Sequence, residues 1–396
     1  MSYTNFVYQQ PTEIVFGKNS IEALGEFAVK YGAKKVLLVT GGESVRKSGL
    51  LDQVIDRLEE AGIGYSLLLG CTPNPRSTFV DTGAAKYNKE CCNFILAVGG
   101  GSVIDASKAM AMLVSNPNEG GIWHYMSGKG HFKKNAIPVA AVLTLAATGS
   151  ECNDGFVISN DKTQEKMIGS HKSAKPVFSI CDPEYTYTVG KWQTACGVSD
   201  IISHVLEQYV YNDDTADVSD GMCIGILKSV MKWGPIALKH PDNYDARANL
   251  MWASTIGLNG ILGSGHGENW VTHMLEHALS ALFDVSHGAG LACLTPRYLA
   301  FISEQDGAGK LDRLGIELFG MESTDKNIKA DTVKRFFRFF QSLGMPLTLG
   351  ELVKAAITYE TINMLAEKAL PWGAMEVGGY NPFTLEDAKE VFRMCI

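Results

Sequence analysis

Two segments of the chain carry potential metal ligands at helical spacing. Asp200 and His204 are four residues apart in an apolar stretch, and His273 and His277 repeat that spacing. Residues four apart lie on the same face of a helix, so each pair is predicted to point into the protein. His287 follows in a segment that we interpret as a loop. Imidazole and carboxylate ligands without thiolates hold zinc or ferrous iron and can leave one position for a substrate, which predicts a catalytic metal site.

The other histidines carry a weaker signal. A single histidine on an apolar helix is more often a hydrogen-bonded core residue than a ligand, and only the pairing favours a metal. His266 has no partner at helical spacing in its glycine-rich segment, so we assign it a structural or substrate-gating role. We expect solvated surface positions for the remaining four, which are His124, His131, His171 and His240.

Three glycine-containing turns follow predicted strands in the first half of the chain: Thr40–Ser44, Gly99–Ser102 and Ala147–Glu151. Gly99–Ser102 also precedes a helical stretch, and in such a turn backbone N–H groups and the helix dipole stabilise a phosphate. In open α/β sheets ligands bind outside the carboxyl ends of the strands, so we expect a nucleotide at these turns. The alternative for an isolated triple glycine is a tight turn without a ligand. Asp105, one turn into the helix, either complements the helix dipole or contacts substrate.

These residues need two kinds of scaffold. The first half alternates apolar runs, such as Lys35–Val39, Phe94–Val98 and Ile137–Leu143, with amphipathic stretches, which is typical of a Rossmann-like parallel sheet. Beyond Pro183 helical patterns dominate, including Ala195–Val210, Gly221–Met231 and Trp270–Phe283. We therefore predict an α/β nucleotide-binding domain over residues 1–188 and an all-α metal-binding and substrate domain over residues 189–396.

Composition limits the partners. A chain of 396 residues exceeds what one hydrophobic core usually supports, and 46% hydrophobic with 20% charged residues is an ordinary globular balance. A net charge of −8 argues against nucleic acid or an anionic membrane as partner, and we see neither a spanning segment nor a secretory signal. Nine cysteines without a Cys-x-x-Cys pair suit a reducing compartment. We expect a cytoplasmic protein that acts on small molecules.

Several motifs together resemble the iron-containing (group III) alcohol dehydrogenase family, and most closely its butanol dehydrogenase branch. The matching segments are Pro11–Gly17, Gly41–Ser44, Asn74-Pro75, Val98–Asp105, Thr144–Glu151, Gly197–His204 and His273–Gly288. The resemblance implies the fold shared with dehydroquinate synthase, a homodimer, and an NAD(P)-dependent alcohol dehydrogenase or aldehyde reductase that acts on small primary alcohols and aldehydes.

The resemblance also implies a role for individual residues. The implied ligands of the metal, Fe²⁺ or Zn²⁺, are Asp200, His204, His273 and His287. His277 would then lie beside the metal, where it orients the nicotinamide and relays a proton. Asp105 matches an acid that lines the same cleft, so His277 and Asp105 are the implied catalytic residues. The implied cofactor contacts are Gly41, Gly42, Ser44, Asn74, Gly100, Gly101, Ser102, Thr144, Thr148 and Lys166.

Cofactor choice is left open by one departure from the family pattern. Many members of this branch have glycine where this chain has Glu43, and an acid there would repel the 2′-phosphate of NADP. Arg46 and Lys47 follow and can compensate, so family grounds place NADP slightly ahead of NAD. A glycerol dehydrogenase-like polyol oxidoreductase and a non-catalytic sensor of nucleotide and metal are the alternatives. A cyclase resembling dehydroquinate synthase would need basic side chains around the metal, which the helical half lacks beside Asp200 or His273.

Overall fold

The computed structural model describes residues 3–213 and 215–396 and divides into two compact units. One unit contains residues 9–189 and 241–255, and the other contains residues 1–8, 190–240 and 256–396. We refer to them as the sheet unit and the helical unit. Among the described residues, no helix has the length and apolar character needed to span a bilayer.

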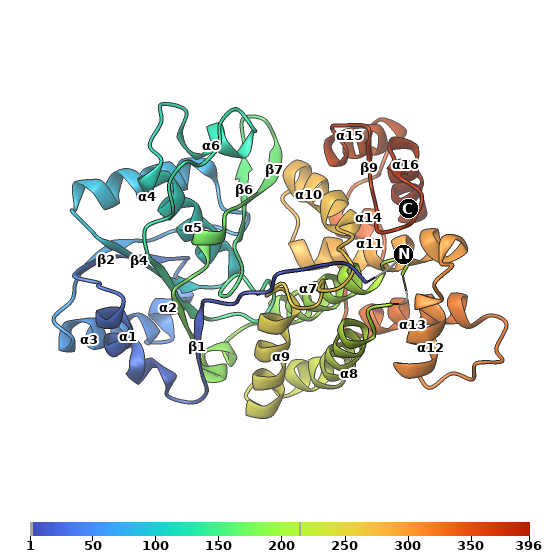
Figure 1. The fold of residues 1–396 in the computed structure, drawn as a ribbon, viewed down its shortest axis with the longest axis horizontal. Coiled ribbons are helices and arrows are strands. Elements are labelled where there is room, and N and C mark those ends of the chain that lie inside the picture. Colours follow the sequence, from blue (N-terminus) through green and yellow to red (C-terminus); the bar gives the residue numbers. More distant parts are fainter. Residues whose placement is uncertain (1–2, 214) are drawn as a thin grey trace. The chain divides into compact units, whose positions relative to one another are not determined.

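The sheet unit is built on six parallel strands in the order β1-β8-β5-β4-β2-β3. Figure 1 shows helices on both faces of this sheet. The strands are β1 (Glu13–Phe16), β2 (Lys35–Thr40), β3 (Gly64–Leu68), β4 (Phe94–Gly99), β5 (Val139–Leu143) and β8 (Phe178–Cys181). The helices are α1 (Leu24–Lys30), α2 (Ser44–Lys47), α3 (Leu50–Glu60), α4 (Ser77–Lys89), α5 (Gly101–Ser115), α6 (Gly121–Met126) and most of α9 (Tyr244–Gly257). A separate antiparallel hairpin pairs β6 (Gly155–Asn160) with β7 (Glu165–Ser170).

Burial explains why these strands have apolar sequences. All residues of β4 and β5 are buried, because helices cover both faces of a parallel sheet. Side chains of one sheet face pack with α4, α5 and α6, and those of the other face pack with α1 and α3. In α3 the buried residues Leu50, Leu51, Val54 and Leu58 follow the period of a helix with one covered face.

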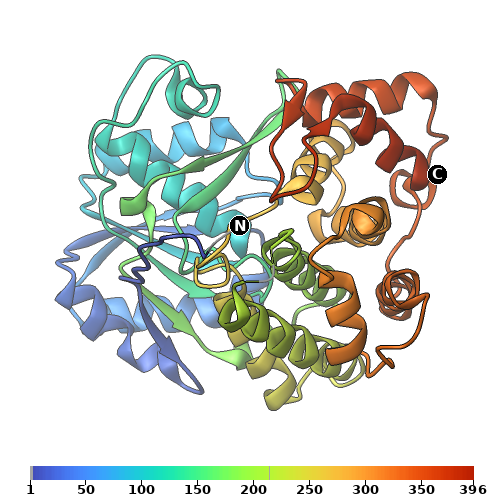
Figure 2. The same ribbon diagram turned by 45° about the vertical axis from the view of Figure 1, so that its right-hand side comes forward.

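The helical unit carries almost all of the chain after Gly190, and the yellow to red part of the ribbon in Figure 2 is mostly helix. Its helices are α7 (Lys191–Tyr209), α8 (Asp217–Lys239), α10 (Val271–Phe283), α11 (His287–Ile302), α12 (Lys310–Glu317), α13 (Ile328–Ser342), α14 (Leu349–Val353), α15 (Tyr359–Ala369) and α16 (Leu385–Met394). Two short strands, β9 (Ala374–Met375) and β10 (Phe383–Thr384), form a small ribbon. Helix α7 packs against α8 and α11, and α11 packs against α10.

Candidate metal centre and nucleotide turns

Three helices of the helical unit carry the predicted metal ligands. Asp200 and His204 lie one turn apart on α7, and His273 and His277 lie one turn apart on α10. The interpretation of His287 as a loop residue is wrong, because α11 begins at His287 with Ser286 as its N-cap residue. The packing of α7, α10 and α11 therefore brings all five side chains to one region of the helical unit.

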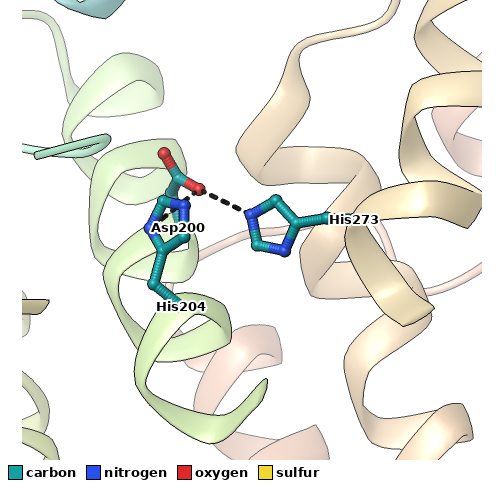
Figure 3. A group of neighbouring side chains, drawn as sticks. All are labelled: Asp200, His204 and His273. Atoms are coloured by element: carbon teal, nitrogen blue, oxygen red, sulfur yellow. Dashed lines mark ion pairs between the residues drawn. The ribbon is translucent and has the colours of Figure 1, made fainter. Parts of the chain in front are cut away.

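One carboxylate oxygen is the centre of this group. The Oδ1 atom of Asp200 lies 3.5 Å from Nδ1 of His204, 3.7 Å from Nε2 of His273 and 3.6 Å from Nε2 of His287. Figure 3 shows the side chains of Asp200 and His204 on one helix, with His273 opposite them and directed at the carboxylate. One ligand atom from each of these three residues lies within 4.8 Å of the other two. His277 forms a second such group with His287 and a glutamate, Glu276.

Burial and charge separate the pKa values of these groups. Burial alone would raise the pKa of Asp200, but the imidazoles of His204, His287 and His273 hold it well below its ordinary value. Burial lowers the pKa of His204 to about 3, although Asp200 opposes that shift. Burial also acts to lower the pKa of His273, but the carboxylates of Glu207 and Asp200 raise it to about 10. Without a metal ion, His273 therefore carries a proton at neutral pH, whereas His204 does not.

Two glutamates that sequence reasoning missed complete the surroundings. Glu207 lies on α7 with a side chain that is 1% exposed, and its Oε2 accepts a hydrogen bond from Nδ1 of His273. Glu276 lies on α10 with a side chain that is 0% exposed, and its Oε2 contacts Nδ1 of His287. Glu207 falls three residues after His204, and Glu276 falls three after His273. An acid at that spacing in an otherwise apolar helix is the sequence signal that marks both.

In the sheet unit, two of the predicted nucleotide turns touch each other. They follow β4 and β5, which are neighbours in the sheet, and the backbone N–H of Thr144 donates to the carbonyl of Gly99 over 3.1 Å. Gly100 is the N-cap residue of α5, so Gly101 and Ser102 begin the helix. A β-carbon on Gly101 would lie 2.5 Å from Oγ1 of Thr148. Only glycine allows this close approach of the two turns.

The remaining predicted cofactor residues lie in the same unit. Gly41 and Gly42 follow β2, the other neighbour of β4, and the carbonyl of Gly41 accepts a hydrogen bond from the N–H of Gly70 over 2.9 Å. Ser44 is the first residue of α2. Asn74 has a left-handed backbone conformation with a φ of 51°, which asparagine tolerates better than most residues. Lys166 lies on β7.

Asp105 holds the start of α5 to two other segments. Its carboxylate accepts hydrogen bonds from the hydroxyl of Ser150 and, over 2.9 Å, from the backbone N–H of Val157. Burial raises the pKa of Asp105, and Lys108 and Lys166 oppose the shift. Lys108, with a side chain that is 0% exposed, lies 3.9 Å from Asp105 and donates to the carbonyl oxygen of Ser150 over 2.9 Å. These contacts hold the start of α5 to the segments that contain Ser150 and Val157, which is a third role beside the two considered for Asp105.

The histidines outside the metal group vary in burial. His266 is buried, where its Nδ1 lies 2.7 Å from the carbonyl oxygen of Gly267 and its ring stacks on Tyr211. His171 is half-buried and accepts the N–H of Ser173 at the start of a short 3-10 helix, so the expectation of a solvated residue is wrong there. The same expectation is wrong for His124, which is half-buried with its ring edge-on to Tyr125, whereas His131 and His240 are exposed as expected.

Comparison with known proteins identifies the family of this chain. Residues 11–183 match the iron-containing alcohol dehydrogenase family, and residues 194–396 match the C-terminal region of the same family. The chain is 39% identical to the NADH-dependent butanol dehydrogenase A of Clostridium acetobutylicum over 391 residues, 98% of this chain and 99% of the relative. It is 37% identical to the NADPH-dependent aldehyde reductase YqhD of Escherichia coli, over 98% of each chain. The chain belongs to the iron-containing alcohol dehydrogenase family.

A solved structure supports the same fold for this iron-containing alcohol dehydrogenase. The crystal structure of NADH-dependent butanol dehydrogenase A from Thermotoga maritima matches with a TM-score of 0.92 and 35% identity, covering 100% of this chain and 99% of the other. The resemblance drawn from the motifs is confirmed, as are the parallel sheet of the first half and the helical second half. Membership of the family implies a nicotinamide cofactor and a divalent metal ion.

The residues around Asp200 fit a divalent ion. Among the described residues, the buried atoms Oδ1 of Asp200 and Nε2 of His273 have no hydrogen-bond partner. Buried polar atoms without partners are costly, and a cation that accepts lone pairs from both would satisfy them. The ligand types, one carboxylate and imidazoles, suit iron or zinc.

Proposed function

We propose that this iron-containing alcohol dehydrogenase interconverts small primary alcohols and aldehydes of the size of butanol and butanal. It uses one divalent ion, Fe²⁺ or Zn²⁺, held by Asp200, His204, His273 and His287. The observation that carries the proposal is the convergence of three imidazole nitrogens, at 3.5 to 3.7 Å, on one buried carboxylate oxygen. The names of relatives with 37–39% identity, which act on butanol or on aldehydes, support the substrate class.

The chain supplies binding, orientation and proton handling. When bound, the metal ion supplies Lewis-acid polarisation of the substrate oxygen and the nicotinamide supplies or receives the hydride. His277, whose ring centroid lies 5.8 Å from that of His287, exchanges a proton with the substrate oxygen and orients the nicotinamide. Asp105 holds the glycine turns in place through Ser150 and Val157. In this assignment Asp105 is a positioning residue.

The nucleotide site occupies the turns of the sheet unit. The contacts are Gly41, Gly42, Ser44, Asn74, Gly100, Gly101, Ser102, Thr144, Thr148 and Lys166. The N–H groups at the start of α5, a helix of 15 residues, stabilise the cofactor diphosphate. The same proposal includes a nucleotide-binding domain over residues 1–188, a metal-binding domain over residues 189–396, a homodimer and a cytoplasmic location. The nine cysteines, which are all free thiols, support that location.

For the cofactor we propose NAD(H) rather than the NADP that family grounds slightly favour. Glu43 is the N-cap residue of α2, and its side chain is 62% exposed. Arg46 lies 3.9 Å from it and is itself 56% exposed, so water screens the pair and Arg46 only weakly offsets the repulsion between Glu43 and an incoming phosphate. A relative at 39% identity is named as NADH-dependent and one at 37% as NADPH-dependent, which leaves the choice to local residues of this kind.

A direct assay tests the function. Protein loaded separately with Fe²⁺ or Zn²⁺ is given butanal with NADH or NADPH, and steady cofactor oxidation is followed. We expect turnover with NADH in at least one metal form. His204→Ala should lose bound metal and turnover together, whereas His240→Ala, at an exposed position at the end of α8, should keep both. Normal turnover with normal metal content in His204→Ala would overturn the ligand assignment.

A further inference from the structure

We propose that Glu276 is a positioning residue of the metal centre, which holds the imidazole of His287 so that its Nε2 faces Asp200. The inference rests on the proposed metal site and goes beyond its four ligands. His287 differs from the other candidate ligands because it is the first residue of its helix and its side chain is 24% exposed. A histidine at such a position needs an external partner to fix the rotation of its ring.

The contacts of Glu276 supply that partner. One carboxylate oxygen, Oε2, accepts a hydrogen bond from Nδ1 of His287, and the other, Oε1, accepts one from the hydroxyl of Ser280. Ser280 lies one turn further along α10 and is buried. Both oxygens are thus engaged from different sides, which fixes the plane of the carboxylate. The fixed carboxylate in turn fixes the plane of the imidazole.

The chain leaves room for this carboxylate at one glycine. A β-carbon on Gly290, one turn into α11, would lie 2.8 Å from Cγ of Glu276 and 3.2 Å from its Oε1. Any larger residue at position 290 would displace the Glu276 side chain from its contact with His287. Gly290 and Ser280 thus shape a site for the Glu276 side chain, in addition to its contact with the histidine.

A second glutamate makes the same arrangement on another helix. Oε2 of Glu207 accepts from Nδ1 of His273, and its Oε1 accepts from the backbone N–H of Thr272 over 2.5 Å. In both cases a buried carboxylate accepts from Nδ1, so when a metal ion is bound the proton stays on Nδ1 and the lone pair lies on Nε2. Those two Nε2 atoms are the ones that lie 3.6 and 3.7 Å from Oδ1 of Asp200. A carboxylate on Nδ1 also makes Nε2 a stronger donor to a metal.

The test measures how long the loaded enzyme keeps its ion. Zinc-loaded wild type, Glu276→Gln and Ser280→Ala are mixed with excess chelator, and zinc release is followed with a dye. We expect Glu276→Gln to weaken zinc binding by about 10- to 100-fold, the usual effect of losing a partner of this kind, and Ser280→Ala to have a smaller effect. Asp306→Asn is the matched control, because Asp306 is also a buried carboxylate of the helical unit but caps the N–H groups of Lys310 and Leu311. It should bind zinc as wild type does.

A second readout distinguishes positioning from general stability. In the zinc-loaded enzyme labelled with ¹⁵N-histidine, the Nδ1 proton of His287 should give a strongly downfield resonance that moves upfield in Glu276→Gln. Equal zinc affinity and an unchanged resonance in Glu276→Gln would overturn the inference while leaving the proposed function intact. Wild type that holds no zinc or iron would overturn the proposed function and this inference with it.

Discussion

Gly288 lies against Cys196 so closely that a β-carbon on the glycine would overlap the carbonyl oxygen of the cysteine. Cys196 precedes Asp200 by one turn on α7, and Gly288 follows His287 on α11. The absence of a side chain at residue 288 therefore lets α11 approach α7 and bring His287 to Asp200. Gly288→Ala should lower the free energy of unfolding by at least about 1–3 kcal/mol, as overpacking does, and weaken metal binding. Thermal unfolding and metal titration measure the two effects.

Gly225→Ala is the matched control for this prediction. Gly225 is an exposed residue of α8, and a β-carbon there would meet nothing within 4 Å. The substitution should leave metal binding unchanged and raise stability by up to about 1 kcal/mol, because alanine is the better helix former. Equal metal affinity in Gly288→Ala and wild type would show that the close approach is not needed for the centre.

The buried Lys108 predicts a large effect in the sheet unit. Burial lowers the pKa of its ammonium group, while Asp105 acts against that shift. Lys108→Met would leave Asp105 without its counter-charge and the carbonyl of Ser150 without this donor. We expect a loss of about 3–5 kcal/mol in unfolding free energy and a higher KM for the nicotinamide cofactor. Chemical denaturation and initial rates measure both.

Removing both charges separates the ion pair from simple packing. The double variant Lys108→Met with Asp105→Asn should lose less stability than the sum of the two single variants, because each single variant leaves one buried charge unpaired and the double variant leaves none. Lys89→Met, at an exposed position in the last turn of α4, should change stability by no more than about 0.5 kcal/mol. Strict additivity of the two single effects would contradict the pairing.

Cofactor preference should respond to Glu43. Glu43→Gln removes the charge but keeps the size of the side chain, so kcat/KM for NADPH should rise by about tenfold, which corresponds to about 1.4 kcal/mol. The value for NADH should change little. Glu59→Gln, an exposed acid on α3, removes the same charge elsewhere in the unit and should not alter the ratio. A tenfold rise in both variants would point to overall charge rather than to Glu43.

The metal-free protein should be most stable near pH 6.5. His204 has a folded pKa of about 3, below the ordinary value of 6.5, so the unfolded chain binds more protons between these values and stability falls as pH drops. His273 has a folded pKa of about 10, so its contribution is complete below pH 6.5 and is lost as pH rises towards 10. Each limb should have a slope of up to about 1.4 kcal/mol per pH unit. Unfolding titrations measure both limbs.

Glu207→Gln tests the origin of the alkaline limb. Glu207 is the first carboxylate that raises the pKa of His273, so its neutral replacement should flatten the decline above pH 6.5 and leave the acid limb in place. Bound metal should also flatten it, because a coordinated imidazole has no proton to lose. A decline of unchanged slope in Glu207→Gln would assign the limb to another group.

The sequence predicted the central strands well for a physical reason. β2, β4 and β5 are buried almost throughout, so their apolar runs are continuous and lie within two residues of the predicted bounds. The N-terminal strand β1 has no fully buried residue, β6 mixes buried and half-buried positions, and β7 has only half-buried and exposed positions. Their continuous apolar runs are no longer than three residues, which is why they were not predicted.

Helix α11 was not predicted because its local sequence is not typical of a helix. It begins with His287 and Gly288, contains Gly290 and has Pro296 in its interior, all of which local propensity assigns to loops or helix ends. Tertiary packing overrides that propensity, because twelve of its residues are buried. Glu207 and Glu276 were not predicted either. Spacing alone indicates which side chains share a helix face, but not which carboxylate on a neighbouring helix accepts a hydrogen bond from a ligand imidazole.

The position of β1 at the edge of the sheet determines when this strand can fold during synthesis. β1 pairs in parallel only with β8 in this sheet, where Glu13 lies opposite Phe178. The first strand to leave the ribosome must therefore wait for the last one before it can form its backbone hydrogen bonds. Loop closure over such a span is slow, so a nascent chain halted before residue 178 should expose an unpaired strand edge and depend on chaperones for its solubility.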